Sequence, residues 1–210
     1  MEKDIFELRS SVRKFTDEEV PENDIREMLE AAIKAPSGKN IQNWHFVVVT
    51  NKRHINAAAD IITEKNKKLR AAAKNDEIKS NLKKYLKFTT HFKNAPVLVL
   101  FFVSDYPVTG EEIMKEAGAS KEEIDALLKA SPGIQNIAAA AENFMLKAAE
   151  LGYGTCWMTS QNYASLELQS YFDIDKEKYN LALITPLGVP AEEVKSPPRK
   201  SLNEVVSWVW

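Results

Sequence analysis

The stretch that organises this chain, residues 35–50, reads APSGKNIQNWHFVVVT. Pro36 ends the preceding helix, because proline disfavours helical geometry at the residue before it and donates no backbone N–H. Small or hydrogen-bonding residues follow up to Asn43, and the β-branched and aromatic run Trp44–Val49 is typical of a strand inside a sheet. A polar loop at the end of a buried strand can hold a ligand, or it can simply connect a helix to a strand.

Length and composition indicate a globular protein of one large domain or two small ones. Of the 210 residues, 44% are hydrophobic and 28% are charged, which is enough apolar material for a substantial core. The net charge is −2, so no bulk field favours nucleic acid or a membrane surface. Basic side chains do cluster between Lys65 and Lys93, but interspersed acids and alanines are typical of a solvated helix face.

The chain shows no membrane, disulfide or metal signature. No apolar run reaches the length of a membrane span, and residues 1–10 are charged and lack a signal-peptide core. A single cysteine, Cys156, excludes an intramolecular disulfide framework, so we expect a cytoplasmic protein. The histidines His45, His54 and His91 have no metal-ligand spacing, and a structural or surface role is expected for each.

Periodicity predicts several helices around four core strands. Helices are expected at residues 3–8, 21–35, 52–73, 134–151 and 166–172, and a helix or a loop at 75–94. Strands are expected at residues 44–50, 97–103, 153–159 and 181–187. The continuous apolar run VLVLFFV predicts that the second of these strands is covered on both faces.

Two segments lie outside this pattern. Residues 104–132 form a variable excursion with helical segments at 111–117 and 121–129, which either caps a pocket or is a mobile surface insertion. The C-terminal tail, residues 203–210, ends in the apolar sequence VVSWVW. Such a tail is a poor free terminus, so we expect it to dock as a strand, on its own sheet or on a second subunit.

The sequence contains an anion-binding candidate but no catalytic side-chain set. Arg9, Ser10, Ser11 and Arg13 place two guanidinium groups and two hydroxyls within five residues, although such runs are also frequent on surfaces. Glycine-rich nucleotide fingerprints, a nucleophile elbow and an evident triad are lacking. Cys156 lies in a hydrophobic segment, where an inert buried thiol is expected. A protein nucleophile is therefore disfavoured.

Four separated motifs occur in the order found in nitroreductase-family flavoproteins. They are RSSVRKF (9–15), APSGKNIQNWHFVVV (35–49), ENFMLKAAELGYGTCWM (142–158) and TPLGVPAEEVKSPPRKSLNEVV (185–206). The chain resembles that family over nearly its whole length. The resemblance implies a single domain, residues 1–210, with an α+β, nitroreductase-like three-layer fold in which helices flank a mostly antiparallel central sheet. It also implies an intertwined homodimer with FMN at the subunit interface.

The resemblance assigns cofactor-binding residues to each motif. The first FMN segment is Arg9, which meets the phosphate, Arg13, at the ribityl or pyrimidine end, and the serines Ser10 and Ser11. Arg199 closes on the phosphate of FMN, and Lys200 lies beside it. The loop that covers the flavin from the partner subunit is Pro36, Ser37, Gly38 and Asn40. The segment that passes the isoalloxazine ring is Gly154, Thr155, Cys156, Trp157 and Met158.

The implied activity is that of an FMN-dependent NAD(P)H oxidoreductase. Hydride from NADH or NADPH passes through flavin N5 to a small acceptor such as a nitroaromatic or a quinone, and no side-chain acid, base or metal is needed. Alternatives are a specialised relative acting by dehalogenation, flavin fragmentation or ring oxidation, and a flavin-storing or flavin-sensing protein with little turnover. Two departures from the family pattern stand out. Asn43 replaces a frequent proline and is expected to loosen the loop, and Glu142 either faces solvent or places an acid near the dimer interface.

Overall fold

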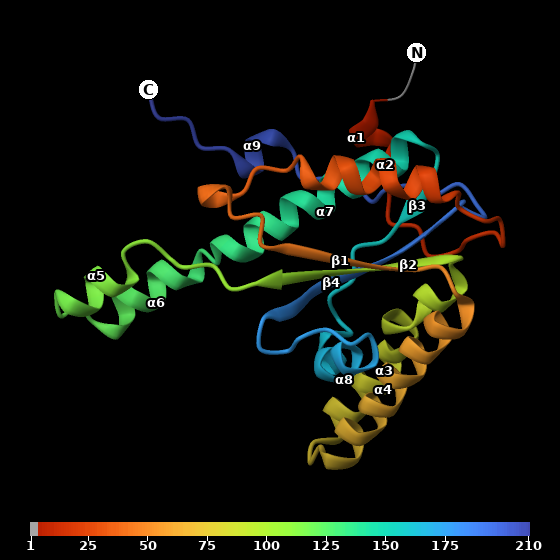
Figure 1. Cartoon of the computed structure of the whole chain (residues 1–210), viewed down its shortest axis with the longest axis horizontal. Helices are drawn as coiled ribbons and strands as arrows, with labels where there is room; N and C mark the ends of the chain where they lie inside the picture. The colour runs from red at the N-terminus through yellow and green to blue at the C-terminus, as the bar shows by residue number, and fades with distance from the viewer. Residues whose placement is uncertain (1–3) are drawn as a thin grey trace.

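The apolar run after Pro96 forms the centre of the fold in a computed structural model, which describes residues 4–210. This run is strand β2 (Val97–Ser104), which pairs antiparallel with β1 (Trp44–Val49) on one side and with β4 (Tyr179–Gly188) on the other. The short strand β3 (Gly154–Thr155) completes the sheet order β1-β2-β4-β3. The antiparallel sheet and its helical layers confirm the predicted α+β fold (Figure 1).

Helices α2 (Glu22–Ile33) and α7 (Pro132–Glu150) cover one face of the sheet (Figure 1). Alternate residues of β2 point towards them, and the Phe101 ring meets the Phe144 ring of α7 edge-on at 5.5 Å between centroids. Helix α7 ends where Gly152 adopts a positive φ of 87°, a conformation that glycine takes without a steric penalty.

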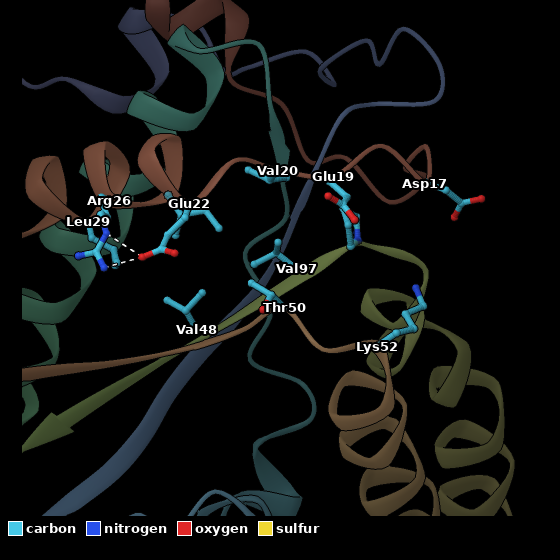
Figure 2. Close-up of a pocket in the computed structure, with 12 residues that line it drawn as sticks. Asp17, Glu19, Val20, Glu22, Arg26, Leu29, Val48, Thr50, Lys52 and Val97 are labelled. Carbon is cyan, nitrogen blue, oxygen red and sulfur yellow. Dashed lines mark hydrogen bonds and ion pairs between the residues drawn. The ribbon is translucent and has the colours of Figure 1, made fainter.

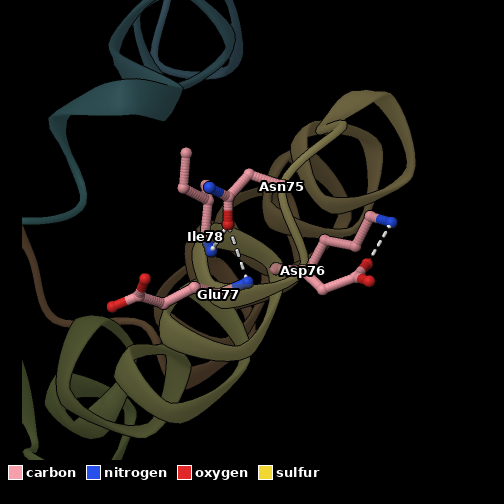
Figure 3. A network of polar contacts seen from close by, with 5 residues as sticks. Asn75, Asp76, Glu77 and Ile78 are labelled. Carbon is pink, nitrogen blue, oxygen red and sulfur yellow. Dashed lines mark hydrogen bonds and ion pairs between the residues drawn. The ribbon is translucent and has the colours of Figure 1, made fainter.

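Helices α3 (Lys52–Ala72) and α8 (Ser165–Tyr171) cover the opposite face, and α4 (Asp76–Thr89) packs on α3. From the sequence, residues 75–94 could be a helix or a loop. The structure shows a helix, and the side chain that caps its N-terminus explains why it forms. The Asn75 side chain accepts hydrogen bonds from the backbone N–H groups of Glu77 (2.8 Å) and Ile78 (3.1 Å) (Figure 3). A single helical turn, His91–Asn94, then leads into β2.

The excursion after β2 leaves the core as an arm. Helices α5 (Glu111–Glu116) and α6 (Lys121–Lys129) project from one end of the molecule, and neither has a buried residue (Figure 1). The two smallest helices are α1 (Ile5–Leu8) and α9 (Leu202–Val205). Two further single turns are Gly38–Asn40 and Asn162–Ala164.

Two expected strands differ from the prediction. The strand expected at residues 153–159 shortens to β3. The Cys156 N–H donates to the side-chain hydroxyl of Thr185 in β4 instead of to a backbone carbonyl, and Met158 then forms an isolated bridge with Ile184. Docking of the C-terminal tail on its own sheet is wrong. Residues 206–210 form no strand, and the Trp210 side chain is fully exposed.

Among residues 4–210, no helix combines the length and the apolar composition that crossing a bilayer requires.

Tyr153 fastens the segment after α7 to the start of α2. Its hydroxyl donates to Asp24 Oδ2 at 2.6 Å. Burial, and then the bond to Asp24, raise the pKa of Tyr153 to about 12. We expect Tyr153→Phe to lower the free energy of unfolding by about 1.5 kcal/mol at pH 7, because a hydrogen bond to a charged acceptor is lost.

The pH dependence of this difference has a defined sign. The protonated hydroxyl is favoured in the folded state, so its contribution is complete below about pH 10, the pKa of an unfolded tyrosine, and is lost as the pH rises towards about 12. Urea unfolding at pH 7 and pH 11 measures it, with the exposed Tyr85→Phe as the control. A difference that grows with pH would contradict the assignment.

Candidate functional site

The RSSVRKF segment runs beside β3 and reaches the residues that directly follow β4. Ser11 forms a parallel bridge with Thr155, and the Val12 N–H donates to the Thr155 carbonyl at 2.8 Å. Further along, the Thr16 N–H donates to the Val189 carbonyl at 2.9 Å. Gly154 permits this approach, because a Cβ there would lie 2.6 Å from a methyl of Val12. The structure thus brings three of the four motifs together.

Cationic and hydroxyl groups of this segment surround a small hollow. Arg9 and Ser10 line a cavity of about 180 Å³ together with Gly154 and Thr155. The Arg9 side chain is 19% exposed, and its Nε lies 3.7 Å from Glu142 Oε1. The sequence left open whether Glu142 faces solvent or lies near a dimer interface. In the structure, its side chain is half exposed and lies beside Arg9. The partly buried guanidinium of Arg9 suits an anion.

Cys156 and its neighbours form the wall next to this segment. The Cys156 thiol is buried, and burial raises its pKa although Arg13, Ser11 and Arg9 oppose the shift. The thiol is therefore neutral at physiological pH, as the expectation of an inert cysteine requires. Beyond it, Trp157 is partly exposed and Met158 is buried against β4.

His91 belongs to this region, although no spacing in the sequence marks it. Its Nδ1 lies 2.9 Å from the Phe88 carbonyl oxygen, which can only accept, so Nδ1 carries the proton and Nε2 is an acceptor. Nε2 is buried and has no partner among the described residues. Burial is the main cause that lowers the pKa of His91, the bond to Phe88 opposes it, and the nearby charge of Arg13 lowers it further.

The loop with Pro36, Ser37, Gly38 and Asn40 is held by an amide network at the other end of the sheet. The Gly38 N–H donates to Asn136 Oδ1 at 3.0 Å, and Asn136 Nδ2 donates to Asn43 Oδ1 at 2.9 Å. Asn43 in turn donates to the Ser104 carbonyl at 2.8 Å and is buried. The expectation that Asn43 loosens the loop is therefore wrong, because its amide ties the loop to β2 and α7.

Within one chain, this loop does not meet the other three motifs. It packs against the first turns of α7, whereas β3 and its neighbours lie at the opposite end of the sheet (Figure 1). Arg199 and Lys200 lie on the exposed segment after β4, where Arg199 donates to the Pro197 carbonyl at 3.2 Å. The predicted site is thus divided between distant parts of the chain.

The polar groups around this hollow suit FMN in their chemistry, but the hollow itself is small. Guanidinium groups suit the dianionic phosphate, and the unpartnered Nε2 of His91 beside Arg13 is a free acceptor for a polar ring edge. A cavity of about 180 Å³ is smaller than ligand sites, which usually span about 300–1,000 Å³. The hollow formed by one chain is therefore smaller than a usual cofactor site.

A larger hollow, about 800 Å³, has the wrong charge for a phosphate (Figure 2). Its rim carries Asp17, Glu19 and Glu22, and the Arg26 guanidinium already pairs with Glu22 at 2.5 Å. Lys52 donates to the Ala95 carbonyl at 3.1 Å. Carboxylates in excess of free cations repel an anion, so we do not place the cofactor here.

No group of three or more histidine, cysteine, aspartate or glutamate side chains that could hold a metal ion occurs in the part of the chain from residue 4 onward.

Known proteins are similar to this chain in sequence and in fold. The nitroreductase family model matches residues 7–189. The crystal structure of a BluB-like flavoprotein from Clostridium difficile is 40% identical, with a TM-score of 0.91, and the match covers 98% of this chain and 97% of that chain. An NADH dehydrogenase of Thermus thermophilus is 27% identical over 90% of this chain and 74% of that protein.

A more distant structure shows the fold alone. It is an FMN-dependent nitroreductase from Clostridium difficile, which is 23% identical, with a TM-score of 0.64 and coverage of 97% of this chain and 96% of that chain.

The amide network gives a stability prediction for the loop. Asn136→Ala removes the acceptor of the Gly38 N–H and the donor to Asn43, so we expect the free energy of unfolding to fall by about 2 kcal/mol. Denaturant unfolding measures it, with the exposed neighbour Gln135→Ala as the control. Equal losses for both variants would show that the network does not hold the loop.

Proposed function

The chain belongs to the nitroreductase family, and we propose that it is an FMN-dependent NAD(P)H oxidoreductase acting on small acceptors such as nitroaromatics or quinones. NADH or NADPH and the acceptor use the same cleft in turn, in a ping-pong sequence. The observation that carries the proposal is the meeting of Arg9 and Arg13 with the Gly154–Met158 segment, held by the Ser11–Thr155 bridge.

The cations of RSSVRKF account for cofactor binding and tuning. When bound, FMN supplies the redox chemistry by taking up and giving up hydride at N5. Arg9 offers a forked guanidinium for the phosphate, and the hydroxyls of Ser10 and Ser11 add donors. Arg13 lies where its charge reaches both Cys156 and His91, so it stabilises negative charge at the pyrimidine edge of the ring.

The neighbouring wall orients the ring and excludes water without taking a proton. Cys156 is neutral and buried, and Met158 and the Gly154 backbone add apolar or small surfaces. His91 is neutral and presents an acceptor at Nε2, because its proton is engaged by the Phe88 carbonyl. No side chain in this set is arranged as an acid or base, which agrees with direct hydride transfer.

The site is completed by a second copy of the chain. The cavity at Arg9 is too small for the cofactor, and the Pro36–Asn40 loop is fixed far from it in the same chain, so in a homodimer the loop of each subunit covers the flavin of the other. The exposed apolar tail, residues 203–210, docks on the partner. Strand β1 offers a free sheet edge for it, since among residues 4–210 β1 pairs with β2 alone. Arg199 and Lys200 precede this tail and close on the phosphate.

A second candidate is a specialised flavoprotein with weak nitroaromatic turnover. The observation that favours it is the greater likeness to the BluB-like flavoprotein, at 40% identity and a TM-score of 0.91, than to the FMN-dependent nitroreductase, at 23% and 0.64. A panel of nitroaromatic and quinone acceptors in steady-state kinetics separates the two candidates.

Anaerobic spectroscopy tests the proposal. The purified protein is expected to be yellow, to bind FMN, and to lose its flavin absorbance on addition of NADH or NADPH. A protein that binds no FMN would falsify the proposal. Bound FMN that nicotinamides reduce only slowly would instead identify a flavin-storing or flavin-sensing protein.

Arg199 gives a quantitative binding prediction. If its guanidinium forms a charge-assisted hydrogen bond to the phosphate, Arg199→Ala weakens FMN binding by about 1.5–3 kcal/mol. Fluorescence titration of the apoprotein measures the dissociation constant, and the exposed Lys195→Ala serves as a control for the loss of one positive charge on the same segment. Equal dissociation constants for the two variants would show that Arg199 does not reach the phosphate.

A further inference from the structure

We propose that Glu142 offsets the charge of Arg9 and thereby lets the flavin site take riboflavin, which lacks the phosphate, as well as FMN. This role of Glu142 rests on the flavin site of the proposed function and concerns which flavins that site accepts. It changes how strongly the phosphate is bound and leaves the redox step at the ring as it is.

Arg9 is the cation of the small hollow beside β3. Of the residues that line this hollow, all of which belong to the described part of the chain, Arg9 alone carries a charge. Its side chain is 19% exposed, so salt and water screen it less than a surface arginine. A negative group beside Arg9 therefore acts on the one cation that the hollow offers to a phosphate.

Glu142 is such a negative group. It lies on α7, seven residues before Ala149, which lines the hollow, and seven residues are about two turns, so both side chains lie on the same face of the helix. Glu142 Oε1 is 3.7 Å from Arg9 Nε, which is longer than a hydrogen bond. The carboxylate therefore lowers the positive potential at Arg9 without fixing the orientation of the guanidinium.

The C-terminal end of α7 acts in the same direction. Ala149 and Gly152 line the hollow, and the last carbonyl groups of a helix carry a partial negative charge. Lys147, the basic residue of the last turn, is already paired with Glu150. The charge of Arg9 is thus opposed by a side chain of α7 and by the end of the same helix.

The other phosphate-binding candidates lie outside this hollow. Arg199 donates to the Pro197 carbonyl on the exposed segment after β4, and Lys200 is exposed beside it. With Arg9 offset, the phosphate depends mainly on one charge-assisted hydrogen bond from Arg199, which favours FMN over riboflavin by about a hundredfold at most. Riboflavin keeps the ring and the ribityl chain, and these face Arg13 and the Gly154–Met158 segment in both ligands.

Flavin exchange on the purified FMN-bound protein tests this role. Riboflavin is added in graded excess, free flavins are removed by ultrafiltration, and chromatography measures the FMN and riboflavin that stay bound. We expect half of the FMN to be displaced at a riboflavin excess of no more than about a hundredfold. Glu142→Gln keeps the shape of the side chain and removes its charge, so it should raise the required excess about fivefold, as expected for one half-exposed carboxylate near a dianion.

Matched variants and salt separate a charge effect from a structural one. Glu142→Asp keeps the charge and should exchange like the unaltered protein, and Glu30→Gln removes a charge from an exposed position of α2 and should do the same. In 1 M NaCl, where the screening length is about 3 Å, the fivefold difference should shrink below about twofold. Fluorescence of FMN released on dilution should show that Glu142→Gln binds FMN more tightly.

The contrary outcomes are distinct. Glu142→Gln that exchanges as readily as the unaltered protein, or more readily, overturns the role of Glu142, since a carboxylate that only positions Arg9 predicts the second result. FMN that no excess of riboflavin displaces overturns it too. Each of these results leaves the proposed function intact, because FMN is still bound. A protein that binds neither flavin overturns both.

Discussion

The central constraint on this protein is the position of α7 between the Pro36–Asn40 loop and the RSSVRKF segment, the two parts of the proposed cofactor site. At about 1.5 Å per residue, its 19 residues span about 28 Å. Asn136 near its start holds the Pro36–Asn40 loop through the Gly38 N–H, and the segment that follows its end forms β3, on which RSSVRKF lies. Phe144 anchors the helix to Phe101 of the central strand. A helix of this length keeps the loop and the RSSVRKF segment apart within one chain.

The electrostatics of the two regions divide their roles. Around RSSVRKF, arginine charges lie beside groups that burial keeps neutral, the Cys156 thiol and the His91 imidazole. A bound phosphate or an electron-rich ring therefore meets positive charge without a competing anion, apart from the half-exposed Glu142. The larger hollow at Asp17 and Glu19 has the reverse balance. Size alone would select the wrong cavity, and the charge of the lining decides between them.

Sequence patterns predicted the elements whose cause is local. The apolar run of β2 required cover on both faces, Pro36 ended α2, and Gly152 ended α7, each through a property of the residue itself. The missed features depend on partners far along the chain. Asn43 stiffens the loop only because Asn136, 93 positions later, meets it.

Placement of the site residues shows the same limit. His91 enters the site only because the Phe88 carbonyl fixes its ring and Arg13 lies nearby. The sequence could not say whether the C-terminal tail docks on its own sheet or on a second subunit, because apolar composition predicts docking but not the surface that receives it. Family resemblance supplied the residue set, and the structure shows how three of its parts meet and why the fourth stays apart.

Subunit complementation tests most directly whether each flavin site is built from two chains. One chain carries Arg9→Ala and Arg13→Ala, and the other carries Asn40→Glu, which brings a carboxylate to the covering loop. Neither homodimer should bind FMN well. In a purified heterodimer with two different affinity tags, one site combines the two intact halves, so one FMN per dimer is predicted. If both halves came from the same chain, every site in the heterodimer would be damaged, and binding as weak as in the homodimers would contradict the account.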